Sequence, residues 1–90
     1  MITFEKQPGD TQDYDVNYNP YLTYLTDTGV SVVVSAETGI TLNSSALAAG
    51  VVKVWLAGGV DGVTYIITVT LTTTAGRIKQ HEFAVKVRDV

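Results

Sequence analysis

The sequence of 90 residues contains no cysteine and only one histidine. Without cysteine, the chain has neither a disulfide framework nor a thiolate metal site. No apolar run approaches the roughly 18 residues that cross a bilayer, so we expect no membrane span and no membrane partner. The opening residues, MITFEKQ, lack the charged start and apolar stretch of a secretory signal. We therefore expect a protein that is made in the cytoplasm.

Basic residues are also scarce, with 6 Lys and Arg against 9 Asp and Glu. Lys6 is the only base in residues 1–45, which hold six acids, whereas residues 46–90 hold five bases and three acids. This asymmetry has two explanations, which are ion pairs between neighbouring strands of one sheet and head-to-tail self-association. Neither half has the density of basic side chains that nucleic acid requires, so we expect no nucleic-acid partner.

Valine and threonine dominate the composition, and apolar and polar residues alternate along several segments. The alternation is clearest in residues 65–72, where Thr68, Thr70 and Thr72 fall on the polar face. Turn residues recur about every ten positions, as in β-sandwiches. We predict an all-β fold, an immunoglobulin-like antiparallel β-sandwich of about seven strands, as a single domain over residues 1–90. A small closed barrel is the alternative architecture.

Three local features refine this prediction. The spacing of Tyr21, Leu22 and Leu25 indicates one helical turn that crosses between the sheets. Alternation places Val30 on the inner face of its strand, together with Val32 and Val34. Ile78 and Phe83 have opposite parity, so the last strand needs a bulge near Lys79 to Glu82 if both point inward.

The stretch WLAGGVDGVTY, Trp55 to Tyr65, predicts a hairpin between two strands. Asp61 and Gly62 tolerate positive φ and would form its turn. Gly58 and Gly59 indicate a bulge or a close backbone approach beside the turn. The glycines do not open a helix, so they form no phosphate-binding loop.

The sequence contains no group of residues with catalytic spacing. His81 lies between Gln80 and Glu82 with no serine nearby, so we interpret it as a solvated strand residue. The run from Asp13 to Asn17 begins like a calcium-binding EF-hand loop, but the required glycine and glutamate are replaced by Tyr18 and Tyr24. We therefore expect no enzyme, no metal site and no cofactor.

The candidate interaction residues are Trp55, Lys53, Asp61, Thr68, Thr70 and Thr72. Val54 and Leu56 occupy the inner face of their strand, which turns Trp55 and Lys53 to the other side. An exposed tryptophan is a candidate contact residue, although a strand buried on both faces would make it part of the core. Asp61 lies in the predicted turn, and the three threonines form a polar strand face. Tyr14, Tyr18 and Tyr65 share the apolar parity of their strands, which indicates core positions.

One arrangement of motifs spans residues 13–88. It comprises DYDVNY at residues 13–18, LTDT at 25–28, WLAGGVDGVTY at 55–65, TTTAGR at 72–77, and FAVKV at 83–87. This arrangement resembles the small immunoglobulin-like structural proteins of tailed bacteriophages and prophages, the fibre–tail adaptor proteins. The resemblance implies a non-enzymatic virion component, tail-associated and assembled in the bacterial cytoplasm. It also implies other phage structural proteins as partners and possible homo-oligomers. The alternative function is a carbohydrate-binding or adhesive β-sandwich, which needs an exposed aromatic platform.

Overall fold

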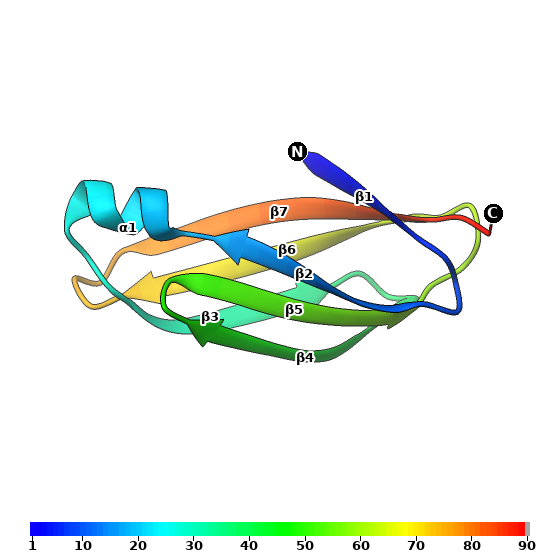
Figure 1. The fold of residues 1–90 in the computed structure, drawn as a ribbon, viewed down its shortest axis with the longest axis horizontal. Coiled ribbons are helices and arrows are strands. Elements are labelled where there is room, and N and C mark those ends of the chain that lie inside the picture. Colours follow the sequence, from blue (N-terminus) through cyan, green and yellow to red (C-terminus); the bar gives the residue numbers. More distant parts are fainter. Residues whose placement is uncertain (90) are drawn as a thin grey trace.

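In the computed structural model, which describes residues 1–89, two β-sheets pack face to face and one short helix crosses between them (Figure 1). The elements in chain order are β1 (Ile2–Lys6), β2 (Thr11–Asn17), α1 (Asn19–Leu25), β3 (Gly29–Ala36), β4 (Ile40–Ala48), β5 (Val51–Gly58), β6 (Thr64–Thr73) and β7 (Ile78–Val87). The all-β prediction with seven strands and a short helical element is confirmed.

The strand order is β1-β7-β6-β3 in one sheet and β2-β5-β4 in the other. The grouping of the third, sixth and seventh strands against the second, fifth and fourth is that of immunoglobulin domains. One pairing departs from the antiparallel prediction, because β1 runs parallel to β7 with Ile2 beside Phe83 and Lys6 beside Val87. The first strand therefore joins the sheet of the last strand, not that of β2.

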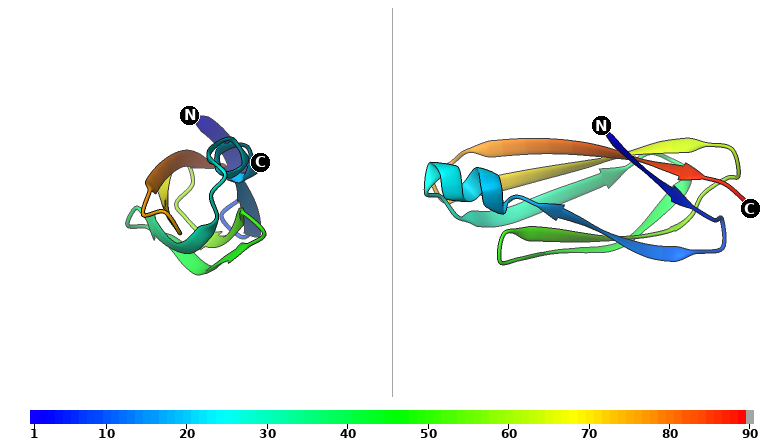
Figure 2. Two further views of the ribbon diagram at one scale, coloured as in Figure 1. Left: turned by 90° about the vertical axis from the view of Figure 1, so that its left-hand side faces the viewer. Right: turned by 45° about the horizontal axis from the view of Figure 1, so that its top comes forward.

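The molecule is elongated, with extents of 43 × 21 × 18 Å. One end, called here the helix end, carries α1 and the turns that connect β4 to β5 and β6 to β7 (Figures 1 and 2). The opposite end, called the tip end, carries the connections at residues 7–10, 37–39 and 59–63. The strands run along the long axis between these two ends, except that β1 lies only beside the part of β7 toward the tip end.

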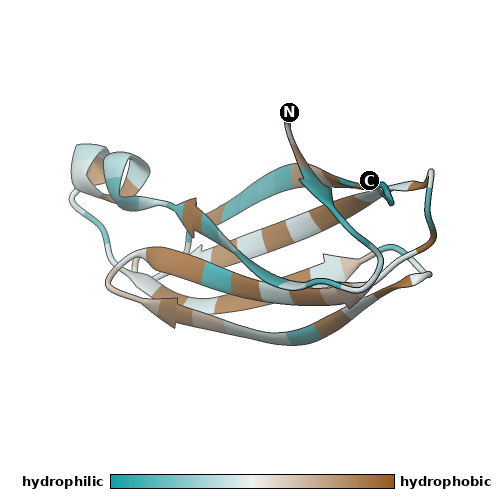
Figure 3. Cartoon of the chain, turned by 45° about the vertical axis from the view of Figure 1, so that its right-hand side comes forward, coloured by the Kyte–Doolittle hydropathy of each residue, from teal (hydrophilic) through white to brown (hydrophobic). Residues whose placement is uncertain are grey.

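The core lies between the sheets and follows the predicted alternation, which appears as alternating brown and pale bands in Figure 3. Phe83 packs edge to face against Phe4, and both rings lie within 6 Å of Tyr14. Tyr14, Tyr18 and Tyr65 are all buried, as predicted. The fully buried aliphatic side chains come from the inner faces of β5, β6 and β7: Val52, Val54, Leu56, Ile67, Val69, Leu71, Val85 and Val87.

One parity prediction is wrong, and the condition attached to a second one is not met. Val30 is 61% exposed, because the β3–β6 register shifts between Gly29 and Ser31 and this bulge turns Val30 outward. Val32 and Val34 do pack against the core. The pairing of β7 with β6 runs from Ile78 onward without a shift, so β7 has no bulge and Ile78 is exposed. Each strand resolves the parity conflict by placing one apolar side chain on the outer face.

The helix lies where a helical turn was predicted, and it starts two residues earlier, at Asn19. Pro20 occupies the first turn, where its missing N–H leaves no hydrogen bond unmade. Leu22 is the buried residue of α1 and covers the core at the helix end. The Asn19 side chain donates a hydrogen bond of 3.0 Å to the Ala49 carbonyl, which ties α1 to the β4–β5 turn.

Candidate interaction surface

Trp55 lies in the middle of β5 on the outer face of the three-stranded sheet and is 38% exposed. Its cross-strand neighbours are Asp13 on β2 and Ser44 on β4. Along β5, its outward neighbours are Ala57 on one side and Lys53 on the other, so small side chains flank the indole ring only on the side of β4 and Ala57. Of the two positions that the sequence left open for Trp55, core or exposed outer face, the fold adopts the exposed one.

Lys53, the next outward residue along β5, is held by two carboxylates of β2. Its Nζ lies 2.9 Å from Oδ2 of Asp13 and 3.2 Å from Oδ1 of Asp15. The hydrogen bond from Lys53 lowers the pKa of Asp13, and the bonds to Asp13 and Asp15 raise the pKa of Lys53. Lys53 thus pairs with both carboxylates, and these two acids and one base leave one negative charge beside Trp55.

The predicted threonine face lies on the opposite outer surface of the sandwich. Thr68, Thr70 and Thr72 are half-buried on β6, in the middle of the four-stranded sheet. Val33 flanks Thr70 on β3, and Ile78 flanks Thr72 on β7, with 68% and 71% of these two residues exposed. Because the two outer faces point in opposite directions, Trp55 and the threonines do not form one site.

Asp61 belongs to neither outer face. It lies at the tip end in a turn closed by a 3.1 Å hydrogen bond from Val63 N–H to the Val60 carbonyl. Gly62 has φ of +86°, whereas Asp61 is not in the positive-φ region, which defines a type II turn. Oδ1 of Asp61 accepts a hydrogen bond of 2.9 Å from Asp89 N–H. Asp61 thus fixes the chain after β7.

The prediction of a hairpin at Trp55 to Tyr65 is wrong, because β5 and β6 belong to different sheets. The stretch crosses from one sheet to the other around the edge of the core. The predicted close approach occurs at Gly59, which has φ of +98°. A Cβ atom there would lie 2.6 Å from Cγ2 of Val87. The Val60 N–H donates a hydrogen bond of 3.0 Å to the Tyr65 hydroxyl, which fixes the crossing.

Sequence reasoning missed Lys6, which is only 3% exposed. Its Nζ donates to the Gln7 carbonyl at 2.8 Å and to the Gly58 carbonyl of the other sheet at 2.6 Å. Burial lowers the pKa of Lys6, and the charge of Asp10 opposes this to a lesser degree. No sequence pattern marks this lysine as buried, because its burial results from the pairing of β1 with β7.

It also missed the role of Asp27, whose side chain is 3% exposed. The carboxylate accepts hydrogen bonds from Thr28 N–H at 2.8 Å and from Ala75 N–H at 3.3 Å, and Arg77 contacts it at 2.7 Å. A hydrogen bond from the Thr73 side chain, supported by the bond from Arg77, lowers the pKa of Asp27 to about 2. The motifs LTDT and TTTAGR carried the signal, since these segments meet here.

The charge asymmetry of the sequence is accounted for by ion pairs within the fold. Lys53, Arg77 and Arg88 of the second half pair with acids of the first half, the last with Glu5 at 3.2 Å. The pairs of Lys53 join adjacent strands of one sheet, as the first explanation predicts, whereas the pair of Arg77 with Asp27 joins two loops. Head-to-tail association stays a prediction.

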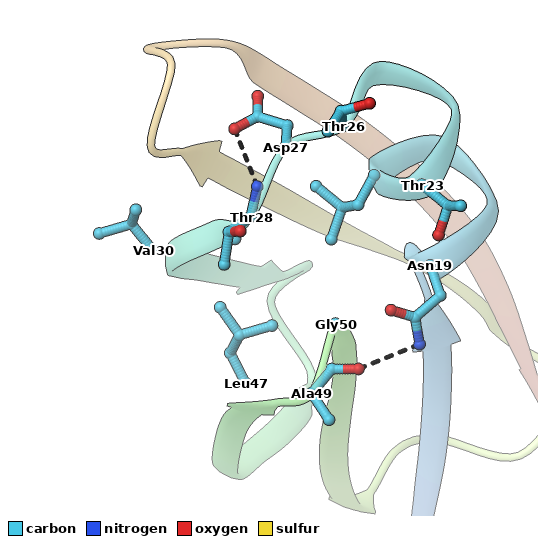
Figure 4. Close-up of a pocket in the computed structure, with 11 residues that line it drawn as sticks. Asn19, Thr23, Thr26, Asp27, Thr28, Val30, Leu47, Ala49 and Gly50 are labelled. Carbon is cyan, nitrogen blue, oxygen red and sulfur yellow. Dashed lines mark hydrogen bonds between the residues drawn. The ribbon is translucent and has the colours of Figure 1, made fainter.

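A surface depression of about 820 Å³ lies at the helix end between α1, the start of β3 and the β4–β5 turn (Figure 4). Leu22 and Leu47 contribute apolar surface, and Asn19, Thr23 and Thr26 contribute polar groups. Asp27 is the one ionisable residue in its lining and is already paired with Arg77. The depression offers no arrangement of acid, base and nucleophile.

His81 is half-buried, not fully solvated as predicted, and lines a shallow pocket with Tyr18 and Tyr21. Within residues 1–89, no group of three or more His, Cys, Asp or Glu residues has a geometry that could hold a metal ion. In the same part of the chain, α1 is too short to cross a bilayer, and no helix qualifies as a membrane span.

These features define a class, the small immunoglobulin-like β-sandwich. The family model of the podophage GP4 fiber-tail adaptor protein gp77 matches residues 6–86, and the chain belongs to this family. The resemblance carried by the sequence motifs is thereby confirmed. Membership assigns the chain a structural, adaptor role in a phage tail. No curated protein matches the chain.

Proposed function

We propose that this protein is a non-enzymatic module of the virion that links tail and fibre proteins through protein–protein contacts. It would be folded in the bacterial cytoplasm during assembly and then built into the particle. The family supports the adaptor role, and the rigid, elongated sandwich with two chemically different outer faces supports a bridging geometry.

The observation that carries the proposal is the position of Trp55. Aromatic side chains at the centre of an interface contribute most of the binding free energy when small neighbours allow close approach. Trp55 has Ser44 and Ala57 as small neighbours, and beside it Lys53 is held by the carboxylates of Asp13 and Asp15. We therefore assign the outer face around Trp55 as the surface that contacts another tail protein.

The test is incorporation of variants into particles. We expect Trp55→Ser to reduce the amount of this protein in purified virions, because the variant loses an aromatic anchor but keeps the fold. Val33→Ser is the matched control, since it removes a more exposed apolar residue from the opposite outer face. Electron cryomicroscopy of wild-type particles would show the contact directly. Wild-type protein absent from both particles and assembly intermediates would refute the virion role.

Trp55 also supports the second candidate, a carbohydrate-binding module, since an exposed indole ring can stack on a sugar. It is the single aromatic residue among the outward positions of β2, β4 and β5 that pair in this sheet. A glycan array distinguishes the two candidates. Wild-type binding to a glycan that is lost in Trp55→Ser, combined with normal incorporation of the variant, would favour the sugar-binding function.

A further inference from the structure

The strand β4 is an edge of the three-stranded sheet, with β5 on one side and no strand on the other. Its nine residues, Ile40–Ala48, include no charged residue and no proline. Apart from Ile40, Leu42 and Leu47, all of them are exposed. Edge strands usually carry charges, proline or a bulge that hinder pairing with another chain. β4 lacks charges and proline, and its bulge at Asn43 lies outside Ser44 to Ala48.

The edge on the opposite side of the same sheet is different. There, β2 carries Asp13 and Asp15 on its outward positions. The edge strand β1 of the other sheet carries Glu5 and ends at Lys6. The edge strand β3 is also uncharged, but the bulky Val30 and Val33 project from it. Only β4 combines the lack of charge with a run of small residues, Ser44 to Ala48, four of which are Ser or Ala.

We propose that two copies of this chain associate through β4, antiparallel and about a two-fold axis, so that their three-stranded sheets become continuous. The charge pattern favours a second copy of this chain as the partner that pairs with β4. In a two-fold pairing, residues near the axis lie beside their own copies, so any charge there meets a like charge. An uncharged strand avoids this repulsion, whereas the same pairing through β2 would bring Asp13 and Asp15 together.

The pairing segment is set by a bulge. The register of β4 against β5 shifts between Leu42 and Ser44, which leaves Asn43 as an extra residue and bends the strand there. Ser44 to Ala48 stay in regular register with β5, so their outward N–H and C=O groups are in position for a new ladder. With the axis near Ala46, small side chains would face one another across the seam.

The dimer would also extend the Trp55 surface. Trp55 pairs with Ser44 and therefore lies one strand away from the seam, on the outer face. The two copies would present both indole rings on one continuous face. This association does not depend on the adaptor function, so either proposal can fail without the other.

The experiment is a charge exchange at Ala46, measured by sedimentation equilibrium up to millimolar protein. We expect wild type to form dimers. We expect Ala46→Lys and Ala46→Glu each to weaken dimerisation by roughly tenfold or more, because like charges meet at the seam. An equimolar mixture of the two variants should recover dimers, since each pair then brings opposite charges together.

The control is Thr70→Lys, which adds the same charge on β6, away from any strand edge, and should leave dimerisation unchanged. Thermal unfolding of each variant reports whether the fold is retained. A monomeric wild type at every concentration overturns the proposal and would direct attention to a strand from another protein. Dimers that persist in Ala46→Lys, or a mixture that stays monomeric while both variants are folded, overturn it as well.

Discussion

The two ends of the sandwich are closed by different physical means. At the helix end, the negatively charged Asp27 collects donors from the Thr28 and Ala75 backbone and from Arg77. At the tip end, the positively charged Lys6 lies among backbone carbonyls, one of which comes from the other sheet. Next to Lys6, Gly59 allows the chain to pass directly over Val87.

The pKa of both Asp27 and Lys6 is lowered, but the two shifts have opposite consequences for the stability of the folded state. For Asp27, hydrogen bonds from Thr73 and Arg77 favour the charged carboxylate, so the lowered pKa stabilises the folded state at neutral pH. For Lys6, burial disfavours the charged ammonium, so the folded state holds a charge that would be better solvated in the unfolded chain. The helix end is thus stabilised by charge, whereas the tip end depends on backbone packing and tolerates a charge.

The largest expected effect concerns backbone packing at the tip end. Gly59→Ala should destabilise the protein by about 3 kcal/mol, because it combines a left-handed conformation with an overlap against Val87. Gly62→Ala is the matched control, with similar φ but open space around the new methyl group, and should cost about 1 kcal/mol. Urea unfolding measures both. Equal losses would show that conformation alone, and not the close approach, determines the glycine at position 59.

The next effect concerns the buried ammonium group. Lys6→Met should destabilise the folded state by about 1 to 2 kcal/mol, because the Gly58 and Gln7 carbonyls lose their donor. Lys86→Met removes an exposed lysine from β7 and should change stability by less than about 0.5 kcal/mol. The measurement is again urea unfolding. A more stable Lys6→Met variant would mean that desolvation of the ammonium outweighs its two hydrogen bonds.

The last effect, and the one that depends on pH, concerns the helix end. The folded pKa of Asp27 is about 2, below the ordinary 3.8, so its contribution is complete above about pH 5 and is lost as the pH falls toward 2. We expect Asp27→Asn to melt below wild type at pH 6, with the difference in Tm shrinking between pH 5 and pH 2. Glu82→Gln, an exposed carboxylate on β7, serves as control. A difference that stays constant down to pH 2 would show that the charge of Asp27 contributes nothing.

Sequence reasoning succeeded where the fold follows a local rule. Alternation along the strands correctly placed Tyr14, Tyr18 and Tyr65 in the core and put Trp55 on the opposite face of its strand from Val54 and Leu56. It failed where a single residue or a distant segment intervened. One extra residue at the start of β3 reversed Val30, because a shift of one position moves a side chain to the other face of a sheet.

For the candidate interaction residues, too, the local property was predicted and the long-range one was not. The sequence correctly identified the outward-facing positions of Lys53, Trp55, Thr68, Thr70 and Thr72, since parity depends on neighbours in the chain. It gave no information on how they are grouped. That grouping depends on which sheet each strand joins, and strand pairing links residues far apart in sequence.

The sequence by itself thus determined the fold class, the inner and outer faces of most strands, and the family. Composition and two-residue periodicity are local properties, and the family motifs are read directly from the chain. Only the tertiary structure decided that Trp55 to Tyr65 crosses between sheets, that Lys6 is buried and that Asp27 joins two distant loops. Each of these depends on long-range pairing, above all on β1 joining β7 in parallel, which no local pattern specifies.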